Sequence, residues 1–203
     1  GTPKSMGGSG DPSVVTAYGV YMGMKGSAKF LWGDDQLKGK KIFIQGIGNV
    51  GRNLINYLQK EDAVILINDI NNEKVEEIKK QYNVEVLSDE EMFNEKIDIY
   101  SPCALGATLN HHTIPKLTCS IVAGAANNQL EEEGVHDIML KNKNILYAPD
   151  FLINAGGLIN VYSELKNFNQ EKALAKTEEI YNTTIAILDL SLIHISEPTR
   201  RYS

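Results

Sequence analysis

The sequence has few cysteines, no long apolar run and no excess of basic residues. Its 203 residues include only 2 cysteines, Cys103 and Cys119, so one disulfide at most and no thiolate cage for a metal can form. This favours a reduced, cytoplasmic setting. No stretch approaches the roughly 18 consecutive apolar residues that a membrane helix needs. Lys and Arg number 20 against 26 Asp and Glu, a net charge of −6, which argues against nucleic acid as a partner.

The length and the 42% share of hydrophobic residues are sufficient for one sizeable domain with its own core. The chain begins at Gly1 without a methionine, and its first residues are too polar and glycine-rich for a signal peptide. We therefore expect residues 1–190 to be one domain of a longer protein whose N-terminal part is missing. Residues 191–203 resemble the translation of a sequencing adapter, so we expect a non-native tail; the alternative is a genuine disordered tail.

Apolar strand-like runs alternate with amphipathic segments along most of the chain. Asp11 and Pro12 are typical of a helix start, and Ser88 with Glu91 fits a capping box that opens a short helix. Strands are predicted at residues 41–46, 63–69, 84–87, 97–102, 119–124 and 144–149, and longer helices at 13–32, 49–59, 71–82, 153–166 and 170–188. This alternation predicts an α/β fold with a doubly wound parallel sheet of the Rossmann type.

The segment between the first predicted strand and the next helix has the pattern G-x-G-x-x-G. Gly46 allows a tight turn, Gly48 lets the backbone approach a pyrophosphate, and Gly51 permits close packing of helix against strand. The phosphates of a dinucleotide would then lie at the helix N-terminus. The strand, turn and helix context makes this pattern a predicted dinucleotide-binding turn.

An acidic residue follows the second predicted strand at the spacing that such a turn requires. Asp69 lies 18 residues after Gly51 and can accept hydrogen bonds from the ribose hydroxyls while repelling a 2′-phosphate, so NAD is favoured over NADP. The alternative is a glycine turn in another α/β protein, with Asp69 capping a strand end. Before this strand, Asp62 occupies a turn position where a left-handed conformation is expected.

Further segments extend the pattern beyond the glycine turn. They read GGSGDPSVVTAYGVYMGMK (7–25), NDIN (68–71), SPCALG (101–106), AGAANNQL (123–130) and APDFLINAGGLINV (148–161). Together with QGIGNVG they resemble the glutamate/leucine/phenylalanine/valine dehydrogenase family, in the same order along the chain. Within the family the likeness is greatest to the leucine dehydrogenases, of which this chain would be the nucleotide-binding domain.

The resemblance implies reversible, NAD-dependent oxidative deamination of an L-amino acid in a cleft between two domains. It assigns cofactor contacts to matching positions in this chain. The implied contacts are Thr16 for the nicotinamide carboxamide, Gly46, Ile47, Gly48, Asn49, Val50, Gly51 and Arg52 for the pyrophosphate, Asp69 and Ile70 for the adenosine end, Cys103, Ala104, Ala125 and Asn128 as lining, and Asn154 near the nicotinamide.

Substrate choice is assigned by the same resemblance to Leu158 and Val161, which lie three residues apart and so share one helix face. An apolar pair cannot satisfy a γ-carboxylate, which favours leucine, valine and isoleucine; the alternative is that both residues pack into the core. The catalytic lysines and aspartate of the family belong to the missing N-terminal domain, so this fragment alone is expected to be inactive. The full-length protein is expected to be a homo-oligomer.

Other functions remain open at this stage. A phenylalanine or valine dehydrogenase is the nearest alternative, and a non-catalytic NAD-binding regulatory module is the alternative outside enzymes. No metal site is expected, because the adjacent His111 and His112 would point about 100° apart on a helix. Cys103 could be a nucleophile, but a small residue against the cofactor is the favoured interpretation, since no basic partner lies near it in sequence.

Overall fold

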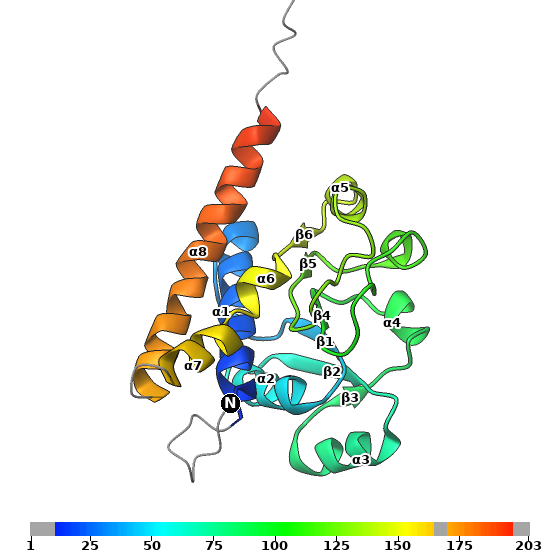
Figure 1. Cartoon of the computed structure of the whole chain (residues 1–203). Coiled ribbons are helices and arrows are strands. Elements are labelled where there is room, and N and C mark those ends of the chain that lie inside the picture. The colour runs from blue at the N-terminus through cyan, green and yellow to red at the C-terminus, as the bar shows by residue number, and fades with distance from the viewer. Residues whose placement is uncertain (1–10, 165–169, 197–203) are drawn as a thin grey trace, which may run out of the picture.

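A parallel sheet of six strands organises residues 11–164 and 170–196, the part of the chain described by this computed structural model (Figure 1). The strand order is β3-β2-β1-β4-β5-β6, and every pairing is parallel. This is the order of a six-stranded dinucleotide-binding sheet, with its reversal point between β1 and β4. The predicted doubly wound fold is confirmed. The strands are β1 (Lys41–Gln45), β2 (Val64–Asn68), β3 (Glu85–Val86), β4 (Ile99–Pro102), β5 (Ile121–Val122) and β6 (Leu146–Tyr147).

The strands bury both of their faces, as strands of a parallel sheet do. Ile42 and Ile44 point into one hydrophobic cluster, and Phe43 between them points into a second cluster on the opposite face. The same alternation divides Ile65 and Ile67 from Leu66, as expected from the two-residue period of a strand. The sheet therefore needs helices on both sides.

Helices cover each of these clusters. The first cluster lies under α1 (Ser13–Trp32), α2 (Asn49–Gln59), α3 (Asn72–Gln81), α6 (Asp150–Ile153) and α8 (Gln170–Ser196). The second lies under α4 (Glu91–Asn94), the 3-10 turn η2 (Ile114–Lys116) and α5 (His136–Asn142). The capping box before α4 is confirmed, because Ser88 and Glu91 exchange side-chain and backbone hydrogen bonds of 2.7 and 3.2 Å.

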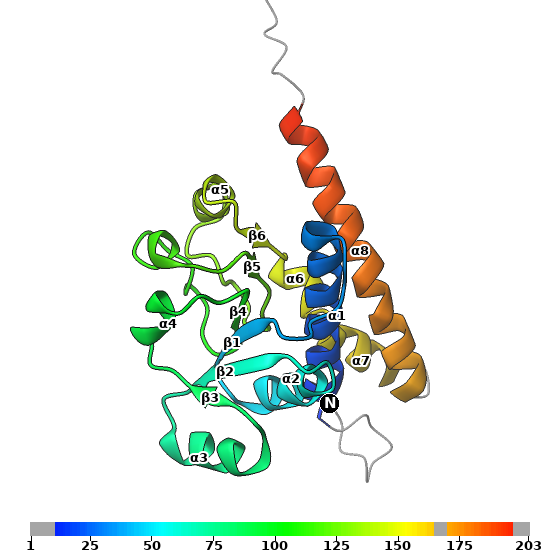
Figure 2. The same ribbon diagram turned by 180° about the vertical axis from the view of Figure 1, so that it is seen from behind.

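Glycines on α1 let two later helices approach its backbone closely. α8 runs alongside α1 in both views (Figures 1 and 2). A Cβ at Gly23 would lie 2.3 Å from Ile153 Cγ2, and one at Gly26 would lie 2.8 Å from the Tyr181 carbonyl oxygen. These glycines therefore join the C-terminal helices to the first helix and fix where α6 lies beside the sheet.

The start predicted for the helix over residues 153–166 is wrong, because this helix begins at Gly156. A separate short helix, α6, covers Asp150–Ile153, and a turn at Asn154 and Ala155 separates it from α7 (Gly156–Glu164). The break allows Gly156 to meet α1, since a Cβ there would lie 2.3 Å from the Val15 carbonyl oxygen. Residues 165 and 166 of the predicted helix lie outside the described residues.

The predicted end of the last helix near residue 188 is also wrong. α8 continues to Ser196, because no glycine or proline interrupts the chain before Pro198. The expected non-native tail overlaps this helix, and residues 197–203 of the tail lie outside the described residues, as do residues 1–10. The origin of the tail stays a prediction.

A half-buried carboxylate ties α1 to the turn before β2. Glu61 accepts hydrogen bonds from the Tyr21 hydroxyl and from the Lys25 ammonium, the latter at 2.7 Å. Burial alone raises the pKa of Glu61, but these hydrogen bonds and the charge of Lys25 outweigh it and lower the pKa below its ordinary 4.5. The next residue, Asp62, has the expected left-handed conformation, with φ 57°.

Because the folded-state pKa of Glu61 is depressed, the carboxylate stabilises the fold above pH 4.5, and this contribution disappears as the pH falls through the folded pKa. We expect Glu61→Gln to lower the free energy of unfolding at pH 7 by about 1.5–3 kcal/mol. The difference from the unsubstituted protein should shrink below pH 4. Urea unfolding at both pH values measures it, and a loss that is equal at both would contradict the assignment.

Candidate dinucleotide-binding site

The glycines of the turn between β1 and α2 have three different environments. Gly46 has φ 99°, and a Cβ there would lie 2.6 Å from Ala104 Cβ. A Cβ at Gly51 would lie 2.2 Å from the Gly46 carbonyl oxygen. A Cβ at Gly48 would meet nothing within 4 Å. Gly46 and Gly51 are thus required by the fold itself, whereas the space above Gly48 is open to a bound group.

The N-terminus of α2 is suited to an anion. Gly48 is its N-cap residue, so no side chain caps the helix, and the first turn contains no acidic residue. The first backbone N–H groups of a helix have no intrahelical acceptor and carry a partial positive charge. Phosphate oxygens fit this position. The guanidinium of Arg52 donates to Gln81 and Glu77 of α3 at 2.6 and 2.9 Å, so its predicted phosphate contact requires an exchange of partners.

Asp69 joins the glycine turn to the end of β2. One carboxylate oxygen accepts the Ile47 N–H and the other accepts the Asn71 N–H, both at 2.9 Å. A carboxylate offers about four acceptor positions, so two remain for ribose hydroxyls. Asp69 therefore combines the strand-end cap that was the alternative interpretation with a capacity for ligand binding. The neighbouring Ile70 is fully exposed.

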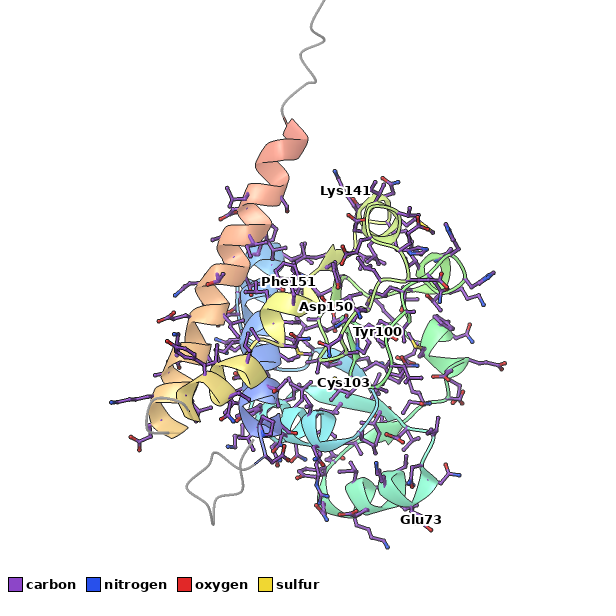
Figure 3. All side chains as sticks on the ribbon, in the orientation of Figure 1. Glu73, Tyr100, Cys103, Lys141, Asp150 and Phe151 are labelled. Atoms are coloured by element: carbon purple, nitrogen blue, oxygen red, sulfur yellow. The ribbon has the colours of Figure 1, made fainter. Side chains whose placement is uncertain are left out.

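Backbone hydrogen bonds join the ends of β1, β4 and β5 beside this turn. The Cys103 N–H donates to the Gln45 carbonyl at 2.8 Å, and the Ala126 N–H donates to the Pro102 carbonyl at 2.9 Å. The connection brings the predicted lining residues Cys103, Ala104, Ala125 and Asn128 to the carboxyl edge of the sheet, where ligands of such sheets bind. Figure 3 places Cys103 there, with Asp150 above it on α6.

Cys103 is not activated for nucleophilic chemistry. Burial raises the pKa of its thiol, and Sγ lies 3.4 Å from Ser101 Oγ. A neutral thiol is a weak nucleophile. Within the described residues, no group of three or more His, Cys, Asp and Glu side chains could hold a metal ion.

The helical side of the site is formed by α1, α6 and α7. Thr16 Oγ1 donates to the Pro12 carbonyl at 3.1 Å. A Cβ at Gly157 would lie 2.8 Å from Thr16 Oγ1. Thr16 is therefore next to the start of α7. On α7 itself, Leu158 is 74% and Val161 42% exposed. The alternative that these two residues pack into the core is wrong in this structure.

Several residues at this edge were not predicted from the sequence. Leu105 and Phe151 are large apolar side chains that are 75% and 71% exposed. Two hydrogen bonds join the loop after β5 to α6 and its C-cap residue: the Gln129 N–H donates to Asp150, and the Asn154 amide donates to Asn127. A large apolar side chain three residues after a strand end, as at Leu105, is a signal that could have been used. The hydrogen bonds join distant segments and leave no local pattern.

Comparison with known proteins decides the family. A model of the Glutamate/Leucine/Phenylalanine/Valine dehydrogenase family matches residues 7–72 and 62–191. The chain belongs to this family. The resemblance of its motifs is thereby confirmed, and its relatives are amino-acid dehydrogenases.

Relatives whose names give different substrates have about the same sequence identity to this chain. An L-tryptophan dehydrogenase of Nostoc punctiforme is 46% identical over 90% of the chain and 52% of the relative. A leucine dehydrogenase of Bacillus cereus is 47% identical over 94% and 52%, and a phenylalanine dehydrogenase of Thermoactinomyces intermedius is 46% identical over 92% and 51%. The chain spans about half the length of these relatives, and overall identity does not separate their substrates.

Solved structures agree with this assignment. The crystal structure of the Nostoc punctiforme L-tryptophan dehydrogenase superposes with a TM-score of 0.87 at 44% identity, over 90% of the chain and 55% of that structure. A hetero-hexameric glutamate dehydrogenase of Thermus thermophilus, at 21% identity, has a TM-score of 0.72 over 92% and 49%; at that identity the likeness concerns the fold alone. None of the helices described in residues 11–164 and 170–196 is long and apolar enough to cross a membrane.

Proposed function

We propose that this chain is the NAD-binding domain of an amino-acid dehydrogenase that oxidatively deaminates leucine, and also valine and isoleucine, to the 2-oxo acid and ammonia. The observation that carries the proposal is the open space at Gly48 beside an uncapped helix N-terminus, with Asp69 one strand away. The remaining contacts follow from the family resemblance. When bound, the nicotinamide supplies the hydride acceptor.

The preference for NAD over NADP rests on Asp69. Its two free acceptor positions suit the two ribose hydroxyls, and its negative charge opposes a 2′-phosphate. Ile70 and Leu105, exposed after β2 and β4, offer apolar surface to the adenine. Thr16 and Asn154 lie on the helical side, where the nicotinamide end would bind.

The preference for a branched aliphatic substrate rests on Leu158 and Val161. Both are apolar and exposed on α7, so they can cover an aliphatic side chain but leave a γ-carboxylate unpaired, which costs several kcal/mol. One methylene changes discrimination by only about 1–3 kcal/mol. Leucine, valine and isoleucine are therefore all expected to react.

The rest of the enzyme is expected in an N-terminal domain that carries the catalytic lysines and aspartate. The isolated chain should bind NAD and catalyse no turnover, and the full-length protein should be a cytoplasmic homo-oligomer. A phenylalanine or valine dehydrogenase is the alternative within the family, and a phenylalanine dehydrogenase relative is 46% identical. A non-catalytic NAD-binding regulatory module is the alternative outside enzymes.

The test is to recover the upstream coding sequence, express the whole protein and follow NADH formation with a panel of L-amino acids. We expect kcat/KM for leucine, valine and isoleucine to agree within about tenfold, and glutamate to be at least ~100-fold poorer. A preference for phenylalanine or tryptophan would overturn the substrate assignment. No turnover with any amino acid, together with retained NADH binding, would favour the regulatory module.

A further inference from the structure

The loop after β5 is held by a buried side chain. Gln129 is completely buried, and its amide nitrogen donates to the carbonyls of Gly124 and Ala126 at 2.8 and 2.9 Å. Both carbonyls belong to the loop that carries Ala125 and Asn128. The side chain of Gln129 thus joins the two ends of this turn through hydrogen bonds of its own.

Asp150 joins the same loop to α6. One of its carboxylate oxygens accepts the Gln129 N–H at 3.0 Å, and its backbone carbonyl accepts the Asn154 N–H at 3.0 Å. Asp150 lies at the start of α6, over the edge of the sheet (Figure 3). The loop and the helix end that carries Asn154 are therefore fixed relative to each other.

A second connection acts on the side chain of Asn154 itself. Its amide nitrogen donates to Asn127 Oδ1 at 2.6 Å. Because an amide has its donor and acceptor on opposite sides, this contact turns Asn154 Oδ1 away from the loop. No donor in the described part of the chain is bonded to that oxygen, which leaves it available to the N–H of a ligand carboxamide.

We propose that Asn127 is a positioning residue that orients the Asn154 carboxamide toward the nicotinamide end of the cofactor. The proposal rests on the proposed function, since it requires a nicotinamide dinucleotide in this site. Asn127 is exposed, so its substitution does not disturb the core. Gln129 and Asp150 hold the loop that carries Asn127 in place beside α6.

The test is the affinity of the chain for NADH and for ADP-ribose, which has the same adenosine and pyrophosphate but no nicotinamide. We expect Asn127→Ala to weaken NADH binding about fivefold and to leave ADP-ribose binding within twofold. Asn127→Asp should bind both ligands within twofold of the unsubstituted protein, because a carboxylate can accept the Asn154 N–H but cannot donate. Asn127→Ala should add nothing to the loss caused by Asn154→Ala.

Three results would overturn the proposal: equal effects of Asn127→Ala on NADH and ADP-ribose, an Asn127→Asp variant as weak as Asn127→Ala, or additive losses in the double variant. In each of these cases the dinucleotide site itself would stand, provided that the unsubstituted protein binds both ligands. If the folded, unsubstituted protein binds neither ligand, the proposed function and this inference both fail. Thermal unfolding of each variant checks that the fold is retained.

Discussion

Replacing Gly48 with valine is expected to weaken NADH binding at least 100-fold while leaving the fold nearly as stable. A Cβ at this position meets no protein atom within 4 Å, and its φ of −66° suits any residue. The loss of a favourable N-cap residue costs about 1 kcal/mol, or roughly 2–4 °C in Tm for a chain of this size. The added side chain would occupy the space that the phosphates need. Calorimetric titration and thermal unfolding measure the two effects.

The matched comparison is Gly51→Val in the same turn. There a Cβ would lie 2.2 Å from the Gly46 carbonyl oxygen, so binding and folding should be lost together, with Tm falling by more than about 5 °C. If Gly48→Val binds NADH as tightly as the unsubstituted protein, the open space at Gly48 is not a phosphate site. If it unfolds like Gly51→Val, the position is structural.

Replacing Asp69 with asparagine is expected to weaken NADH binding about 10- to 100-fold and to reduce the preference for NADH over NADPH at least tenfold. Hydrogen bonds to a charged acceptor contribute about 1.5–3 kcal/mol, and the asparagine no longer repels a 2′-phosphate. One side-chain oxygen remains to accept a backbone N–H, so part of the connection between Ile47 and Asn71 is retained. Fluorescence titrations with both dinucleotides measure the change.

Asp62→Asn is the control for this charge change. Asp62 precedes β2, whereas Asp69 follows it, so the two carboxylates lie at opposite edges of the sheet. Asparagine also tolerates the left-handed conformation of residue 62. The control should leave both affinities unchanged. Equal effects of the two substitutions would mean that only net charge matters, and an unchanged preference in Asp69→Asn would contradict the ribose assignment.

Local patterns predicted the sheet and the glycine turn well. Runs such as Ile42 to Ile44 and Ile65 to Ile67 have the length and apolar character of buried strands, and the structure places both in the sheet. The strand ends were less predictable: β5 and β6 pair over two residues each, although longer apolar runs were expected. Pairing depends on the neighbouring strand, which local composition does not contain.

Contacts between distant segments account for what could not be predicted. The break between α6 and α7 depends on the approach of Gly156 to Val15 of α1. The hydrogen bond between Asp150 and Gln129 joins residues 21 positions apart. Such contacts arise only when the sheet brings strand ends together, so the positioning residues of the site became visible in three dimensions alone.

A calorimetric titration of the folded chain with NADH tests the central claim most directly, because it needs neither the N-terminal domain nor an amino-acid substrate. We predict saturable binding of one NADH per chain and markedly weaker binding of NADPH. A chain with the circular dichroism of an α/β fold that releases or absorbs no heat with NADH, across two temperatures, would contradict the assignment of a dinucleotide site to the turn at Gly46 to Gly51.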